Sequence, residues 1–329
     1  MSEPALSFII PLVRLNDYVR ETVERLKALS NPDWEAIIVT NEPQLTEWGD
    51  DKRIRLIDSG AVGPAQKRDM AARIAQGSIL TFIDDDSYPD EQFVDKCLSA
   101  FMNNSISAVG GPALTPPSNS FWQKVSGAVF LSRFTGGNPN RYRPVGNQRE
   151  VDDWPSVNLS VRRNEFISIG GFDTRFWPGE DTFLCWKLKQ HGLKIIYVPE
   201  LTVWHHRREG FMRHLKQVAA YGLHRGYFAR HFPSTSRRLR YFLPSLLSVF
   251  LVLMPVLIST SNIGYFSSLC LSILYVNSIL IGLIEVSRMT SIRIALCSSV
   301  YVVGTHLVYG INFIRGFLIS GELQSRLRK

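Results

Sequence analysis

The feature that most constrains this chain is its apolar C-terminal third. The run Tyr241–Ile284 contains no Asp, Glu, Lys or Arg, and Ile294–Ile314 is a second run without these residues. The first run is more than twice the roughly 20 residues that a helix needs to cross the hydrocarbon core of a bilayer. The sequence therefore excludes a purely soluble protein and predicts a helical membrane domain over residues 241–329.

Within this domain we expect three membrane spans, at residues 241–259, 263–284 and 294–319. Five arginines flank the first two spans: Arg237, Arg238, Arg240, Arg288 and Arg293. Because Lys and Arg favour the cytoplasmic side, both outer ends of this hairpin are predicted to be cytoplasmic. A complete third span would place the basic tail Arg326–Lys329 on the other side. The third run is therefore expected either to span or to be re-entrant or interfacial.

A basic segment, residues 207–240, precedes the first span in a chain whose formal net charge is +8. Its Lys and Arg residues are accompanied by a single acid, Glu209, while Phe211, Leu215 and Val218 share one helical face. Elsewhere in a protein such a pattern is an ordinary solvated face. Directly before a membrane span it predicts a cytoplasmic surface helix attracted to anionic lipid.

The first 206 residues have the pattern of an α/β domain. Short apolar runs alternate with amphipathic stretches, as in a mostly parallel sheet. We expect strands at residues 6–10, 36–39, 54–57 and 78–83, and helices at residues 65–76, 164–169 and 181–190. Between residues 112 and 153 the pattern weakens into loops around a short helix. The four cysteines form no CxxC pair, which argues against a zinc ribbon.

Three consecutive aspartates, Asp84–Asp86, follow the fourth predicted strand. Ligands of open α/β sheets bind at this carboxyl edge, and adjacent carboxylates repel one another unless a counter-charge is present. On extended backbone Asp84 and Asp86 point to the same side, so these two can hold Mg²⁺ or Mn²⁺ together with substrate phosphates. The alternative is that Asp86 or Ser87 caps the next helix.

A second acidic pair, Glu180-Asp181, begins a predicted helix after Pro178. A carboxylate here can act as general base toward a hydroxyl, although acids are also ordinary in the first turn of a helix. Arg68 is a candidate phosphate ligand or a surface arginine. His205 offers either a metal ligand or a structural hydrogen bond.

Several short motifs occur in the order and spacing of a known family. They are Ser7–Pro11, Gly63-Pro64 with Arg68, Phe82–Asp86, Asn158–Arg163, Gly170–Asp173, Gly179–Asp181, and Pro199 with His205. Over residues 5–230 they resemble the family 2 glycosyltransferases of the GT-A fold. The resemblance implies a Rossmann-like GT-A catalytic domain over residues 1–206, with the basic segment and the α-helical membrane domain after it.

The resemblance also implies roles for individual residues. Asp181, with Glu180, is the expected catalytic acid pair, and Asp181 the general base. Asp84 and Asp86, with His205, are the expected ligands of Mg²⁺ or Mn²⁺. The expected contacts to the nucleotide-sugar donor are Pro11, Asn41, Glu42, Arg68, Asp84, Asp85, Asn158 and Arg162.

Two departures from the family pattern bear on specificity. Asn41-Glu42 stands where relatives carry paired acids that touch the nucleotide base, so the usual preference for uridine is in question. The Gln-x-x-Arg-Trp motif of processive members is absent, the nearest string being Gln217–Tyr221. We therefore expect transfer of one sugar in each reaction rather than extrusion of a polymer.

The predicted activity is a metal-dependent, inverting hexosyltransferase reaction on a nucleotide-sugar, at the cytoplasmic face of the inner (plasma) membrane. The expected acceptor is a lipid-linked saccharide in envelope or extracellular polysaccharide synthesis, and no feature points to nucleic acid. One alternative is a bare polyprenyl phosphate as acceptor. A nucleotidyltransferase is a weaker alternative, because residues 11–16 lack the glycines of its phosphate loop. An inactive membrane scaffold is the alternative outside enzymes.

Overall fold

The computed structural model describes residues 3–42, 47–174 and 176–323. These residues form two compact units. The first, the α/β unit, contains the described residues up to Pro116 together with Arg143–His206. The second, the helical unit, contains Pro117–Tyr142 and Arg207–Leu323. The predicted basic tail Arg326–Lys329 lies outside the described residues.

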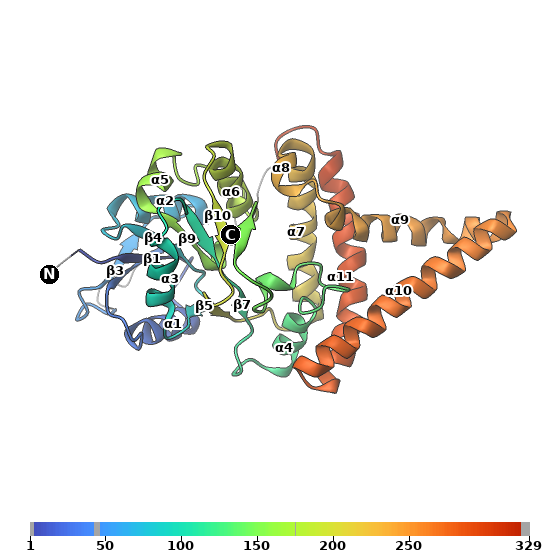
Figure 1. The fold of residues 1–329 in the computed structure, drawn as a ribbon, viewed down its shortest axis with the longest axis horizontal. Coiled ribbons are helices and arrows are strands. Elements are labelled where there is room, and N and C mark those ends of the chain that lie inside the picture. The colour runs from blue at the N-terminus through green and yellow to red at the C-terminus, as the bar shows by residue number, and fades with distance from the viewer. Residues whose placement is uncertain (1–2, 43–46, 175, 324–329) are drawn as a thin grey trace. The chain divides into compact units, whose positions relative to one another are not determined.

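In the described part of the α/β unit, the main sheet has eight strands in the order β3-β2-β1-β4-β9-β6-β10-β8 (Figure 1). Their bounds are β1 (Leu6–Pro11), β2 (Trp34–Thr40), β3 (Ile54–Asp58), β4 (Ile79–Phe82), β6 (Ala108–Gly110), β8 (Arg149–Val151), β9 (Leu159–Arg162) and β10 (Ile195–Tyr197). Strands β1 to β4 pair in parallel, while β9 and β8 run antiparallel to their neighbours. This mostly parallel sheet confirms the predicted α/β class.

Helices cover both faces of this sheet. Successive strand residues point to opposite faces, so Phe8 and Ile10 of β1 join one buried cluster and Ile9 joins the other. The first cluster is closed by α1 (Asp17–Lys27) and α3 (Phe93–Phe101). The second is closed by α2 (Pro64–Ile74), α5 (Arg163–Ser168) and α6 (Glu180–Gln190). Burial on both faces explains why the central strands are apolar runs rather than alternating patterns.

A smaller sheet contains β5 (Ser87–Pro89), β11 (Val203–His205) and β7 (Ala113–Leu114), in that order. Strand β11 is antiparallel to β5, with His205 opposite Ser87. Because Ser87 directly follows Asp86, this register brings the end of β11 to the aspartate turn.

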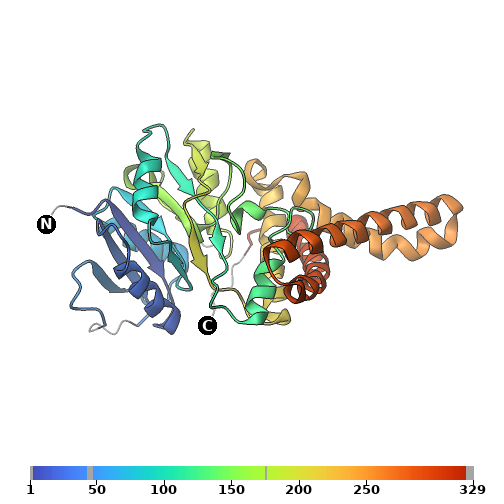
Figure 2. The same ribbon diagram turned by 60° about the horizontal axis from the view of Figure 1, so that its bottom comes forward.

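The helical unit contains the long apolar helices. Its helices are α4 (Phe121–Ala128), α7 (Phe211–His231), α8 (Pro233–Ser236), α9 (Leu239–Thr260), α10 (Asn262–Met289) and α11 (Ile292–Leu318). Three of those described, α9, α10 and α11, are long and apolar enough to cross a membrane, at the places where the sequence predicts spans. Helices α9 and α10 project from the rest of this unit as a hairpin (Figure 2).

The segment Pro117–Tyr142 differs from the sequence-based expectation, which assigned all of residues 1–206 to one domain. In the structure it belongs to the helical unit. Val125 and Val129 of α4 share a buried cluster with Tyr301 and Val302 of α11. The Ser126 hydroxyl lies 2.7 Å from His214 Nδ1. The apolar face of this short helix is thus buried against helices that follow it by more than eighty residues, which local sequence patterns do not report.

Candidate functional site

The aspartates Asp84–Asp86 form the turn that joins β4 to β5. The Asp84 N–H donates to Ser87 Oγ at 3.0 Å, and the Ser87 hydroxyl donates to the Asp84 carbonyl at 2.9 Å. Ser87 is buried, so this pair of hydrogen bonds holds the turn in place. The next helix, α3, begins at Phe93 after Gln92. The aspartates therefore do not cap it, and the alternative role as a helix cap is wrong.

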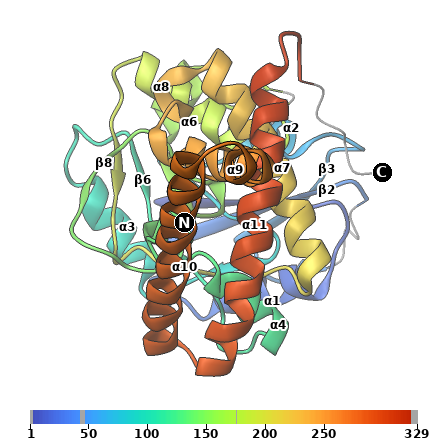
Figure 3. The ribbon, with the colours of Figure 1, turned by 90° about the vertical axis from the view of Figure 1, so that its right-hand side faces the viewer.

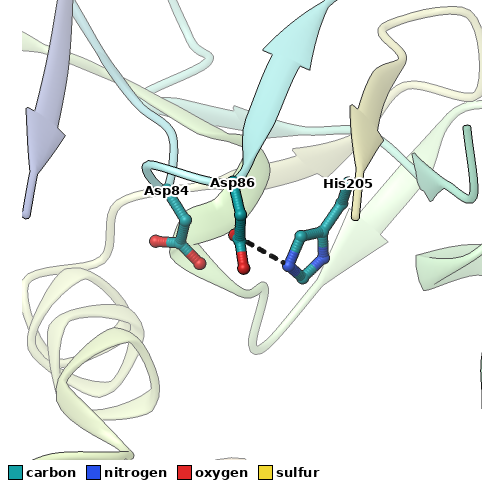
Figure 4. Close-up of side chains that lie close together, drawn as sticks. All are labelled: Asp84, Asp86 and His205. Atoms are coloured by element: carbon teal, nitrogen blue, oxygen red, sulfur yellow. Dashed lines mark ion pairs between the residues drawn. The ribbon is translucent and has the colours of Figure 1, made fainter. Parts of the chain in front are cut away.

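His205 joins this turn through the pairing of β11 with β5. Its Nε2 lies 3.2 Å from Asp86 Oδ1, and both side chains are largely buried. One ligand atom from each of Asp84, Asp86 and His205 lies within 4.8 Å of the others. Figure 4 shows the two carboxylates side by side, with the imidazole facing Asp86. Two carboxylates and an imidazole are a donor set that fits Mn²⁺, and fits Mg²⁺ less well because Mg²⁺ prefers oxygen ligands.

The neighbouring His206 has a different environment. Its Nε2 lies 3.0 Å from Glu21 Oε2, and its ring packs on Tyr18 with a centroid distance of 4.5 Å. Both partners belong to α1. The His206 side chain therefore ties β11 to that helix, while its backbone N–H donates to the Asp86 carbonyl at 2.9 Å; the side chain that lies beside the acidic turn is that of His205.

Arg68 connects the two acidic clusters that the sequence singles out. Its Nη2 lies 2.7 Å from Asp84 Oδ1 and its Nη1 lies 3.0 Å from Glu180 Oε1. The guanidinium is 2% exposed. One buried cation thus holds the turn after β4 and the start of α6 at one place, although nearly a hundred residues separate them in the chain. The alternative of a surface arginine is therefore wrong, and the expected contact of Arg68 with a phosphate stays a prediction.

The two acids at the start of α6 lie in different environments. Glu180 is buried, and burial, opposed by Arg68 and reinforced by the adjacent Asp181, raises its pKa to about 7. Asp181 is half-buried. Its Oδ1 accepts the Thr182 N–H at 2.7 Å, and its Oδ2 accepts the Ser156 N–H at 3.4 Å. Glu180 is therefore committed to Arg68, whereas Asp181 keeps access to solvent and is oriented by backbone donors.

Two residues expected to contact the donor have structural contacts instead. Arg162 pairs with Ile79, at the start of β4, because β9 runs antiparallel and carries it away from the aspartates. Its guanidinium donates to the carbonyls of Ile106 and Phe101. Asn158 is fully buried and donates to the carbonyls of Pro112 and Leu201. The side chains of Arg162 and Asn158 thus bind backbone carbonyls in this structure, and their contact with the donor stays a prediction.

The remaining expected donor contacts lie at the carboxyl ends of β1, β2 and β4. Pro11 is the buried last residue of β1, and Asn41-Glu42 follows β2, with Glu42 exposed. Asp85 Oδ2 accepts a hydrogen bond from Asn16 Nδ2 at 2.7 Å. Since the carboxyl ends of parallel strands share one edge of a sheet, these residues line the same edge as the aspartate turn.

Sequence reasoning did not single out Lys67, which the structure places at this edge. Its Nζ donates to the Leu12 carbonyl and, at 2.6 Å, to Asn41 Oδ1. Burial lowers the pKa of Lys67, and the nearby Asp85 opposes that shift. The sequence feature that could have identified Lys67 is its position next to Arg68, near the start of α2. Successive residues of a helix point about 100° apart, so the two cations reach different parts of the edge.

Asp69, the next residue of α2, was also missed. Its two carboxylate oxygens accept the N–H groups of Phe172 at 2.8 Å and Asp173 at 2.9 Å. Burial raises the pKa of Asp69, and these two backbone bonds oppose the shift. The bonds hold the Gly170-Gly171 turn, in which both glycines have positive φ. Asp69 thus fixes the loop that leads to α6 and its acids.

We expect Arg68→Met to destabilise the α/β unit by about 3–5 kcal/mol, the usual cost of removing one partner from a buried ion pair. The change would leave Glu180, whose side chain is 8% exposed, without its cation. Arg73→Met is the matched control, because Arg73 is exposed on the same helix and such changes stay within about 0.5 kcal/mol. Urea unfolding measures both. Equal midpoints for the two variants would contradict the bridging role.

Comparison with protein families gives a match over most of the chain. The model described as "Glycosyl transferase family group 2" matches residues 79–309. This stretch begins at β4 and includes the aspartate turn, the start of α6 and most of the long apolar helices. The match thus covers parts of both units.

Three curated proteins show partial similarity. The chain is 28% identical over 222 residues to the O-antigen biosynthesis protein RfbC of Myxococcus xanthus, covering 62% of this chain and 17% of that protein. It is 25% identical over 165 residues to a pre-mycofactocin glycosyltransferase of Mycobacterium tuberculosis, covering 49% and 33%. It is 23% identical over 201 residues to the glucosyl-dolichyl phosphate glucuronosyltransferase of Haloferax volcanii, covering 56% and 63%. In each case the chain spans less than two thirds of the relative.

A solved structure extends the similarity to nearly the whole chain. Mannosyltransferase PcManGT from Pyrobaculum calidifontis, in complex with GDP-Man and Mn²⁺, aligns with a TM-score of 0.60 at 13% identity. The alignment covers 92% of this chain and 86% of that one. At this identity the likeness shows the fold alone. It confirms the predicted GT-A fold, with apolar helices following the α/β unit.

Proposed function

This chain belongs to the family described as glycosyl transferase family group 2, and on that premise we propose an inverting transfer of one sugar from a nucleotide-sugar to an acceptor hydroxyl. The observation that carries the proposal is the guanidinium of Arg68, which contacts Asp84 on one side and Glu180 on the other. A site for the diphosphate and a base for the acceptor must lie close together in such an enzyme, and this bridge brings the two acidic clusters to one place.

Asp181 is the proposed general base. It takes the proton of the acceptor hydroxyl, and the acceptor oxygen bonds to the anomeric carbon on the face opposite the diphosphate. The bond from that carbon to the diphosphate oxygen breaks through an oxocarbenium-like state, as in glycoside hydrolysis. A single displacement of this kind inverts the configuration. Glu180 is the less suitable base because it is buried against Arg68.

Asp84, Asp86 and His205 are the proposed holders of a divalent cation, because their donor atoms lie within 4.8 Å of one another. A cation there would supply positive charge to the departing diphosphate. The related fold of PcManGT was solved with Mn²⁺, which supports Mn²⁺ as the first ion to test. Asn41, Glu42 and Asp85, at the same sheet edge, are the proposed contacts to the rest of the donor.

For the acceptor we propose a lipid-linked saccharide. The relatives named above include an O-antigen biosynthesis protein and an enzyme named for a glucosyl-dolichyl phosphate, in which a sugar is already attached to a lipid phosphate. The apolar helices α9 and α10 and the Lys and Arg residues of 207–240 suit a chain that meets such a lipid at an anionic surface. We place the α/β unit at the cytoplasmic face of the inner membrane, where nucleotide-sugars are made.

The first experiment is a screen of nucleotide-sugars for thermal stabilisation of the full chain in detergent, with Mn²⁺ and with EDTA. A ligand at 100 times its Kd adds about 2.7 kcal/mol to the free energy of unfolding. We expect one donor class to stabilise the protein only with the cation. Product mass with lipid acceptors then separates an extended saccharide from a monosaccharide on a bare polyprenyl phosphate. Absence of stabilisation by every nucleotide-sugar would contradict the proposal.

A further inference from the structure

Helix α7 packs side by side with the second half of α11. Phe211 and Leu215 lie against Gly304, Gly222 lies against the backbone of Tyr309, and Gly226 against that of Phe313. At the far end Arg230 Nη1 donates to the carbonyls of Phe317 and Leu318 at 3.2 and 3.3 Å. Contacts in the same order along both helices mean that they run parallel. Whatever direction α11 takes relative to a membrane, α7 must take too.

Helix α7 is not suited to cross a bilayer. Arg213 and Lys216 are exposed in its first half, and Arg230 is exposed in its last turn. Cations within a spanning helix are costly unless they face protein or a water-filled cavity. If α11 crossed the membrane, it would carry these cations into the hydrocarbon core with α7.

Helix α9 is apolar, unlike α7, and it runs in a different direction from α11. Figures 1 and 3 show that it runs across α11 rather than alongside it. It meets α11 through its first turns only, where Ser245 Oγ donates to the Gly310 carbonyl at 3.1 Å and Phe242 packs on Phe313 at 4.8 Å. After Ser248 none of its described residues is buried. Since spanning helices tilt by about 20° on average from the membrane normal, a helix that runs across α11 is not aligned to cross the membrane together with it.

We propose that α9 and α10 alone cross the membrane, as a hairpin, and that α7 and α11 lie together along its surface against anionic lipid. Helix α9 has 22 residues, about 33 Å, which matches the hydrocarbon thickness of ~30 Å. Only 11% of the apolar window of α9 and of α10 is buried in protein, against 33% for α11. The lipid core is therefore the partner that the hairpin requires.

The exposed side of α11 fits a surface position. Large apolar side chains recur there at helical spacing, opposite the face that packs on α7: Ile292, Leu296, Val300, Val303 and Ile311. Such a stripe, on a helix paired with a basic one, is the pattern of a helix that lies in the interface. The arrangement also places Arg288, Arg293 and Arg315 on the same side of the membrane as Arg237–Arg240. This agrees with the preference of Lys and Arg for the cytoplasmic side. The interfacial alternative for the third apolar run is thus the one proposed.

Labelling of single cysteines with a membrane-impermeant maleimide tests this topology. The background carries Cys270→Ala and Cys297→Ala, and keeps Cys97 and Cys185, which are buried; burial raises the pKa of Cys97 to about 12. Reporter positions are Met289→Cys before α11 and Gly321→Cys after it. Met102→Cys, at a residue 83% exposed in the α/β unit, marks the side of that unit, and Asn262→Cys marks the tip of the hairpin.

In sealed inverted vesicles and in intact cells we expect the cysteines at positions 102, 289 and 321 to label from one side, and the cysteine at position 262 from the other. Labelling after detergent gives the total for each. A cysteine at position 321 that labels from the side opposite to position 289 would show that α11 crosses, and would overturn the proposal. A cysteine at position 262 on the same side as position 289 would show that the hairpin does not cross. Fluorescent-protein and phosphatase fusions after Glu322 provide an independent measurement of the same side.

Discussion

Replacing Asp181 with asparagine should lower the turnover number by about 10²–10⁴-fold, the range that a general base contributes, while leaving the affinity for the nucleotide-sugar unchanged. Asparagine keeps the shape of the side chain, and its single amide oxygen can still accept the Thr182 N–H, the shorter of the two bonds at 2.7 Å, while the 3.4 Å bond from the Ser156 N–H is given up. It cannot take a proton from the acceptor. A lower turnover number with unchanged donor affinity indicates loss of the base, whereas loss of the fold would lower both.

The matched control for this change is Asp173→Asn. Asp173 is an exposed acid on the loop before α6, with a backbone φ of 37°, a conformation that asparagine tolerates well. Its turnover should stay close to that of the unmodified protein. Turnover is measured with a fixed donor and acceptor, and donor affinity by calorimetry. If Asp181→Asn turned over as fast as the control, another group would be the base, and Glu180 would be the next to test.

Replacing Asp86 with asparagine should remove cation-dependent binding of the donor. Removal of even an indirect partner of a metal ligand costs about 10–100-fold in affinity, so we expect a loss of at least about 100-fold with Mn²⁺. Asp86 is 5% exposed and lies beside His205, where the pairing of β11 with β5 holds it. Calorimetry in the presence of Mn²⁺ measures the loss.

Two controls accompany the Asp86 variant. In EDTA the variant and the unmodified protein should bind the donor equally weakly, because both then lack the cation. Asp90→Asn removes an acid at the end of β5 that pairs with Lys96 at 3.1 Å, and should keep the full effect of Mn²⁺. Unchanged affinity of Asp86→Asn with Mn²⁺ would exclude Asp86 as a ligand.

The aspartate turn illustrates what local patterns predict well. The apolar run before Asp84 marks a buried strand, and the change to acids marks the place where that strand ends. The structure has β4 at Ile79–Phe82, inside the expected residues 78–83. The same holds for α6, whose observed bounds Glu180–Gln190 differ from the expectation by one residue. Strand and helix positions follow from periodicity because each residue's burial recurs with the period of its own element.

Arg162 illustrates what such patterns do not predict. Its motif, Asn158–Arg163, resembles that of the family, and the resemblance alone implied that Arg162 contacts the donor. Strand β9 is antiparallel to β4, and direction depends on which neighbours a strand pairs with. That choice is made by contacts between residues far apart in the chain, and a single strand carries no local mark of it.

The sequence by itself determined the class of fold, the acidic motifs and the apolar helices, since each depends on the burial and chemistry of consecutive residues. Only the tertiary structure decided that Arg68 joins Asp84 to Glu180 and that β5 and β11 bring His205 to Asp86. It also decided that Pro117–Tyr142 packs with the helices. These are pairings between distant segments, whose register and direction are set by the packing of the whole unit.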